Sequence, residues 1–81
     1  MNYNGLRGEI MESKGKYEIQ KQQGKYIIKY SYHNGYRVVS YYVRKTYKNE
    51  YTWTCDYTHA KRLSQQTAEK HLKYLRVNPA F

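Results

Sequence analysis

The chain has 81 residues, with 15 Lys or Arg against six Asp or Glu, and a formal net charge of +9 at pH 7. This length allows one small domain with a thin core, and a positive excess of this size is usually tied to a polyanion. No run approaches the roughly 20 apolar residues of a membrane-spanning helix, and no basic start leads into an apolar signal run. We therefore expect a protein of the cytoplasm without a membrane partner.

The beginning of the chain carries little structural signal. Residues 1–15 mix Asn, Gly and charged side chains without a sustained period, which is typical of a loose N-terminal arm. Residues 16–21 alternate polar with apolar side chains and predict a short, half-buried strand at a sheet edge. We expect one domain over residues 16–77 and a C-terminal tail over residues 78–81.

A turn at Gln22-Gln23-Gly24 leads into a stronger predicted strand over residues 25–32. Side chains alternate between the two faces of a strand, so the apolar ones share a face. That face holds Tyr26, Ile28, Tyr30 and Tyr32, and the other holds Lys25, Ile27, Lys29 and Ser31. The alternation predicts one packed face and one more polar face.

His33-Asn34-Gly35 predicts a tight type I′ hairpin, because Asn-Gly readily takes positive φ angles. The next strand, residues 36–47, should therefore run antiparallel to the previous one. Its apolar side chains fall on both parities, with Val39 and Val43 on one side and Val38 on the other. Such a pattern indicates a β-bulge or two partly covered faces.

A second reversal over residues 48–50 precedes a further strand predicted for residues 51–57. Trp53 shares its phase with Tyr51, Cys55 and Tyr57, and we expect Trp53 at the centre of the core. Cys55, the single cysteine, cannot form an internal disulfide, in agreement with a reducing compartment. We expect it to be a buried strand thiol.

After residue 57 the period changes from strand to helix. Asp56 can cap a short turn, and Ser64 is a good N-cap for a helix over residues 65–76. Ala68, Leu72 and Leu75 form its apolar stripe, and Asn78-Pro79 ends its helical potential. The predicted fold class is α+β, an antiparallel sheet of three to four strands followed by one packed C-terminal α-helix.

The segment from Lys21 to Lys48 contains seven basic residues, seven tyrosines and no Asp or Glu. Cationic side chains attract phosphates and aromatic rings stack on bases, so this segment predicts a nucleic-acid or partner surface. A solvated sheet face rich in Lys and Tyr is the alternative without a ligand. The candidate binding residues are Lys25, Lys29, Tyr30, Tyr32, Tyr36, Arg37, Tyr41, Arg44, Lys45 and Lys48.

Signals for catalysis are scarce. Three histidines and one cysteine are scattered without a zinc-binding spacing, and the five glycines form no phosphate loop. We therefore expect no catalytic residues, no metal and no cofactor, and a protein that acts without chemistry of its own. A small ribonuclease toxin, working with one histidine among basic groups and tyrosines, is the enzymatic alternative.

The junction Leu63-Ser64-Gln65-Gln66-Thr67-Ala68-Glu69, following a Tyr/Lys-rich hairpin sheet, resembles the strand-to-helix junction of the arm-binding domains of phage-type tyrosine integrases. The likeness covers about residues 25–76 in arrangement. It implies a three-stranded sheet with one C-terminal helix, whose sheet enters the major groove of DNA. Arg37, Arg44 and Lys45 would then be the candidate DNA contacts.

The segment from Asp56 to Arg62, with its Ala-Lys-Arg sequence, is similar to segments in small accessory proteins of bacteriophages and prophages. That likeness implies a binding protein acting in a bacterial host cell, on nucleic acid (DNA or RNA) or on a nucleoprotein. The alternative is an anti-CRISPR-like inhibitor that binds a bacterial defence nuclease through the Tyr surface. The positive charge excludes the strategy of mimicking DNA with carboxylates.

Overall fold

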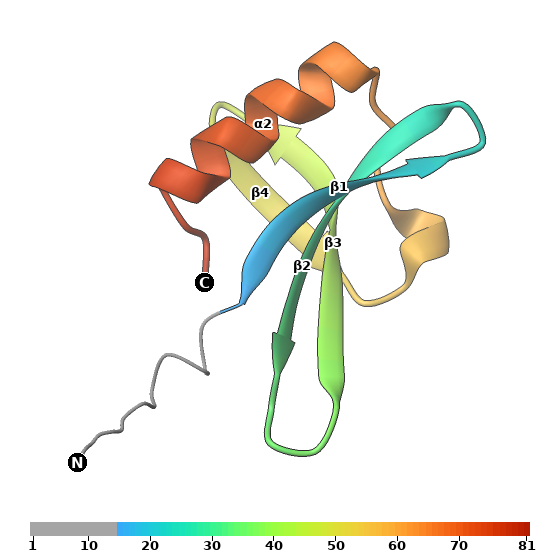
Figure 1. Ribbon diagram of the computed structural model, residues 1–81. Helices are drawn as coiled ribbons and strands as arrows, with labels where there is room; N and C mark the ends of the chain where they lie inside the picture. Colours follow the sequence, from blue (N-terminus) through green and yellow to red (C-terminus); the bar gives the residue numbers. More distant parts are fainter. Residues whose placement is uncertain (1–14) are drawn as a thin grey trace.

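The computed structural model describes residues 15–81, which form a four-stranded antiparallel sheet followed by one helix (Figure 1). In chain order the elements are β1 (Lys16–Gln22), β2 (Lys25–His33), β3 (Val38–Tyr47), β4 (Glu50–Thr54), a 3₁₀ turn η2 (Tyr57–His59) and α2 (Gln65–Val77). The strands follow one another across the sheet in the order β1-β2-β3-β4. This confirms the predicted α+β class. Of the arm predicted for residues 1–15, all but Gly15 lies outside the described residues.

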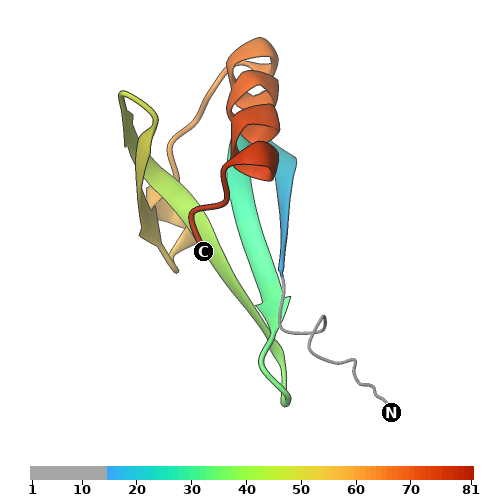
Figure 2. The same cartoon turned by 90° about the vertical axis from the view of Figure 1, so that its left-hand side faces the viewer.

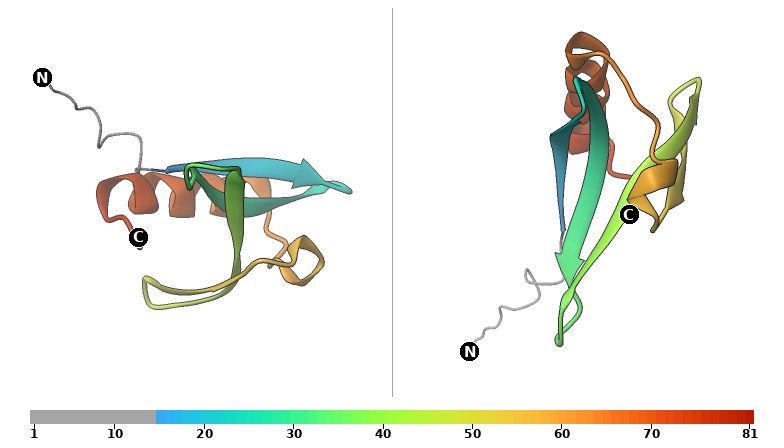
Figure 3. Two further views of the ribbon diagram at one scale, coloured as in Figure 1. Left: turned by 90° about the horizontal axis from the view of Figure 1, so that it is seen from below. Right: turned by 90° about the vertical axis from the view of Figure 1, so that its right-hand side faces the viewer.

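The helix α2 packs against β1 and β2 and leaves β3 and β4 less covered. Figure 2 shows α2 on one side of the strongly twisted sheet, and Figure 3 shows η2 on the other side, against β3. We call the sheet face opposite α2 the outer face. Among the described residues, no helix combines the length and the apolar character needed to cross a membrane.

The core lies between α2 and the middle of the sheet. Ile28, Val43, Ala68 and Leu75 are almost completely buried there. Trp53, expected at the centre, is only half-buried and packs at the margin of this cluster. The reason is that β4 is an edge strand and α2 covers the β1–β2 half of the sheet.

The predicted last strand ends earlier than expected. β4 stops at Thr54, so Cys55 is exposed and the prediction of a buried thiol is wrong. Tyr57, placed in the core phase by alternation, lies instead in η2 and is 52% exposed. The residue at position 56 explains this, because Asp56 caps η2 and ends the extended conformation.

The three chain reversals lie where the sequence predicted them, but the tight type I′ turn expected at Asn34-Gly35 is found at the other two. Asn34-Gly35 belongs to a longer loop in which only Gly35 has positive φ, at 100°, and the Asn34 side chain accepts from the backbone N–H groups of Tyr36 and Arg37. The pairs with two positive φ angles, as in a type I′ turn, are Gln23-Gly24 and Lys48-Asn49. The antiparallel pairing of the flanking strands is as predicted.

The helix boundaries agree with the capping signals. Ser64 Oγ accepts from the backbone N–H of Thr67 at 3.2 Å, and α2 ends at Val77 before Asn78. The C-terminal residues then fold back onto the sheet. The N–H of Ala80 donates to Tyr17 Oη at 2.9 Å, and the Phe81 ring stacks on Tyr30 with centroids 4.6 Å apart. The tail therefore covers part of the aromatic core.

Candidate nucleic-acid interface

The ten candidate residues differ in their accessibility. Six are exposed: Lys25, Tyr36, Arg37, Arg44, Lys45 and Lys48. Lys29, Tyr32 and Tyr41 are half-buried, and Tyr30 is only 7% exposed. Tyr30, Tyr32 and Tyr41 all pack in or against the core cluster. Tyr30 is therefore hardly accessible to a partner, because Tyr17 and Phe81 pack on its ring.

The exposed candidates also lie in separate places. Tyr36 and Arg37 are in the β2–β3 loop, and Lys48 is in the β3–β4 turn. Lys29 pairs with Tyr42, and both side chains lie on the outer face. Lys45 lies on the same face, because the register shift after Val43 moves it there. The structure therefore brings only part of the predicted set together, on and beside the outer face.

A short segment after η2 completes this part of the sheet. The pairing of β2 with β3 ends at Lys29 and Tyr42, and the two strands then diverge. Leu63 forms an isolated antiparallel bridge with Tyr26, with both N–H···O distances at 2.8 Å. The N–H of Lys61 donates to the carbonyl oxygen of Val43, also at 2.8 Å. The segment thus lies between β2 and β3.

This insertion gathers basic residues that are distant in sequence. Lys61 and Arg62, both exposed, are held between Val43 on one side and Tyr26 on the other. Arg44 and Lys45 follow Val43 at the β3 bulge, where the register with β4 shifts, and Lys25 precedes Tyr26. We call these five residues, Lys25, Arg44, Lys45, Lys61 and Arg62, the basic junction.

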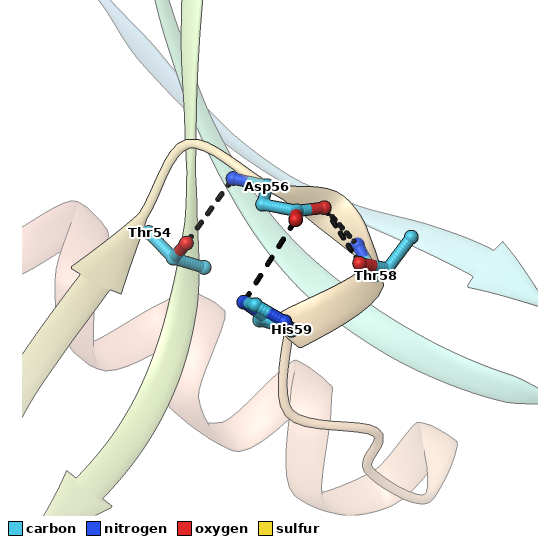
Figure 4. A network of polar contacts seen from close by, with 4 residues as sticks. All are labelled: Thr54, Asp56, Thr58 and His59. Carbon is cyan, nitrogen blue, oxygen red and sulfur yellow. Dashed lines mark hydrogen bonds and ion pairs between the residues drawn. The ribbon is translucent and has the colours of Figure 1, made fainter.

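A polar network holds the segment that leads into the junction (Figure 4). The N–H and the hydroxyl of Thr58 donate to Asp56 Oδ1 at 3.0 and 2.6 Å, and His59 Nδ1 lies 3.8 Å from Asp56 Oδ2. The Asp56 N–H donates to Thr54 Oγ1. The hydrogen bonds from Thr58 lower the pKa of Asp56, so the carboxylate stays ionised. Its arrangement is that of a cap, which positions the backbone before Lys61.

Aromatic rings lie beside the basic junction on the outer face. Tyr42 is half-buried on β3, and its ring centroid is 6.4 Å from that of Tyr57 in η2. Tyr57 and Tyr47 are more than half exposed, and Lys48 Nζ lies 5.3 Å from the centroid of Tyr47. These rings offer faces on which bases can stack.

The charge around the junction is weakly compensated. Residues 1–14 hold two basic and two acidic side chains, so the net charge of +9 falls on residues 15–81. Between residues 15 and 81, the one ion pair of a Lys or Arg with a carboxylate joins Lys16 to Glu18 at 3.7 Å. Lys16 pairs with Ser31, at the end of β1 remote from Tyr26. The cations of the junction can therefore interact with an external anion.

Sequence reasoning missed Lys61, Arg62, Tyr42 and Tyr57 as site residues. The alternation of β3 places Tyr42 in the phase opposite to Val43 and could have found it. No local signal shows that residues 61–63 pair with two strands, because that contact is tertiary.

Within residues 15–81, no three His, Cys, Asp or Glu side chains come together as metal ligands. Asp56 and His59, which lie close together in sequence, both serve the η2 turn. No protein family model, curated protein or solved structure matches the chain. The resemblance to integrase arm domains stays a prediction.

Proposed function

We propose that this domain binds nucleic acid at the basic junction, with Tyr42 and Tyr57 as neighbouring stacking faces. The observation that carries the proposal is the pairing of Lys61 with Val43 and of Leu63 with Tyr26, which sets five cations around one site. Phosphates are the expected counter-charge of such a site, since each neutralised phosphate releases condensed counterions. The rings supply contacts that do not depend on base identity.

The mode of action proposed here is binding without catalysis. It is supported by the role of Asp56 and His59 in capping η2, which leaves the junction with donors and cations but no base beside it in the described chain. A setting in a bacteriophage or prophage, and the cytoplasm of the host cell, are part of this proposal. The exposed thiol of Cys55 fits a reducing compartment.

The test is a titration of a fluorescent mixed-sequence oligonucleotide, duplex and single-stranded, at several salt concentrations. Lys61→Gln combined with Arg62→Gln should weaken binding and reduce the slope of log affinity against log salt. The expected reduction in slope is about 0.7 to 0.9 for each phosphate that the variant no longer neutralises. The matched control, Lys16→Gln with Arg37→Gln, removes the same charge away from the junction.

The two double variants separate a local site from general attraction. Equal losses in both would show that only net charge matters, and unchanged binding in the junction variant would contradict the proposal. Circular dichroism and the urea midpoint check that each variant is folded. Binding of single strands in preference to duplex would add support for stacking on Tyr42 and Tyr57.

A protein partner is the second candidate, favoured by one feature of the β2–β3 loop. Tyr36 is 93% exposed at this loop, next to Arg37, and Tyr and Arg are the residues that most often dominate protein interfaces. An inhibitor of a defence nuclease would use such a projecting ring as an anchor. Tyr36→Ala should abolish that interaction and leave oligonucleotide binding unchanged.

A further inference from the structure

A groove lies on the helix side of the sheet, between the C-terminal half of α2 and the β3–β4 turn. It has a volume of about 370 Å³, and its polar lining residues are Asn49, Lys70, His71, Lys73, Tyr74 and Asn78. Among the described residues that line it there is no Asp or Glu. The groove is separate from the basic junction, none of whose residues contributes to it.

The orientation of His71 is fixed by the sheet. Its Nδ1 lies 2.9 Å from Tyr51 Oη, and the two rings meet edge to face with centroids 5.5 Å apart. Burial raises the pKa of Tyr51, so its hydroxyl keeps the proton. Burial, together with the charge of Lys70, lowers the pKa of His71, so the ring is neutral at pH 7.

From these states we assign the Tyr51 hydroxyl as donor to Nδ1, which leaves the ring hydrogen on Nε2. The groove then offers an imidazole N–H and two ammonium groups, all of them donors. Lys70 and Lys73 are three residues apart on one helix, where like charges repel each other. An anion between the two lysines would relieve this repulsion, and His71 lines the same groove.

We propose that this groove binds a phosphate group, held by Lys70, Lys73 and the Nε2–H of His71. Tyr74 and Val77, the latter 74% exposed, add apolar surface at the same place. A phosphate that carries an organic group, as in a nucleoside monophosphate or a phosphorylated nucleic-acid end, therefore makes more contacts than inorganic phosphate. The site is independent of nucleic-acid binding at the junction.

The experiment follows the imidazole ¹⁵N and ¹H signals of His71 and the backbone amides by NMR, at constant ionic strength. The probes are inorganic phosphate, a nucleoside 5′-monophosphate and the same nucleoside without phosphate. We expect saturable shifts at His71, Lys70 and Lys73 with both phosphates and none with the nucleoside. If the monophosphate binds more tightly than inorganic phosphate, the ligand is a phosphate ester. If the two bind with equal affinity, the groove recognises the phosphate group alone. Both results support the site.

Two variants test the assignment of roles. Lys70→Gln with Lys73→Gln should weaken phosphate binding by at least about tenfold, since two charge-assisted hydrogen bonds are removed. Tyr51→Phe removes the hydrogen bond to Nδ1, so the ring hydrogen of His71 is no longer fixed on Nε2. The His71 ¹⁵N shifts should then change even without ligand. Lys16→Gln with Arg37→Gln, which removes the same charge at residues outside the groove, is the matched control and should bind normally.

The absence of saturable shifts, or the same response to chloride as to phosphate, would overturn the proposal. So would unchanged affinity in the double lysine variant. Since the readout uses no oligonucleotide, these results are independent of whether the basic junction binds nucleic acid.

Discussion

The backbone N–H of Lys61 donates to the carbonyl oxygen of Val43 at 2.8 Å, and this hydrogen bond holds the segment after η2 on the side of β3 that faces β2. It turns two basic pairs, Arg44-Lys45 and Lys61-Arg62, into neighbours. The position of the segment in turn depends on the turn before it. The site is thus a product of tertiary structure, and its disruption should follow from changes outside the cationic residues themselves.

Asp56 gives the sharpest test of this dependence. Asp56→Ala removes a negative charge, so simple electrostatics predicts tighter binding to nucleic acid. We expect weaker binding instead, by a few-fold, because η2 is no longer capped and Lys61 is no longer held beside Val43. Affinity measured by fluorescence anisotropy, with amide hydrogen exchange at Lys61 and Leu63, checks both effects.

The matched control for Asp56 is Glu69→Gln on α2. Glu69 Oε2 accepts from the side chain of Gln65 within the helix, and its removal leaves η2 intact. This variant should bind slightly more tightly than the original chain. If Asp56→Ala behaved in the same way, the cap would have no part in building the site.

Tyr30 and Tyr36 separate the core from the surface. Tyr30→Ala should destabilise the domain by about 3–5 kcal/mol, the range for truncating large buried rings, because Tyr30 is 7% exposed and packs on Tyr17 and Phe81. Tyr36→Ala, at an exposed loop position, should change stability by less than about 0.5 kcal/mol. Urea denaturation measures both, with Tyr30→Leu as a milder variant if Tyr30→Ala does not fold. Equal stability of the two alanine variants would contradict the assignment of Tyr30 to the core.

The fold was largely predictable because local signals and tertiary structure agree. Ser64 accepts from Thr67 as an N-cap should, and Ala68 and Leu75 are buried as the helical stripe required. The edge position of residues 16–21 is also confirmed, and the register shift in β3 agrees with the bulge, one of the two explanations that the sequence left open. Alternation identified which side chains share a face, but it could not show which half of the sheet α2 covers. That is why Trp53 was placed too centrally and Tyr30 too far outside.

The turns show a second limit of local reasoning. Asn34-Gly35 is the better type I′ sequence, yet the Asn34 side chain stabilises a longer loop by accepting from two backbone N–H groups. Gln23 takes positive φ at 51° although its side chain has no local preference for it. The strand registers on either side decide the turn lengths, and registers depend on packing.

Gln23→Asn should therefore stabilise the β1–β2 hairpin. The left-handed conformation costs an ordinary residue roughly 1–2 kcal/mol, and the cost is smaller for Asn. We expect a gain of up to about 1 kcal/mol in the free energy of unfolding, measured by urea denaturation.

Gly35→Ala is the opposite case, because a φ of 100° is unfavourable for Ala. It should be destabilising although no neighbour lies within 4 Å of the added methyl group. A decrease in the stability of Gln23→Asn would show that the turn does not determine the hairpin's stability.

His71 should make the stability of the domain depend on pH in the mildly acidic range. Its pKa is lowered in the folded protein by burial, and further by the charge of Lys70, relative to an ordinary value of about 6.5. Between the folded and the unfolded pKa, the unfolded chain therefore binds more protons, so stability rises with pH there. The contribution is complete above about pH 6.5, is lost as the pH falls toward the folded pKa, and levels off below it.

His71→Gln should remove this step from the pH profile. As the pH is lowered from about 7.5 to about 5, we expect the urea midpoint of the original chain to decrease. The midpoint of the variant should decrease less. The ionised Asp56 acts with the same sign but only in the range of an Asp carboxyl, below about pH 4, so the two effects separate. His33→Gln, at the exposed end of β2, is the control and should keep the dependence that His71 causes. An unchanged profile in His71→Gln would mean that the half-buried pair with Tyr51 does not keep the ring neutral, and the donor role of its Nε2 would lose its basis.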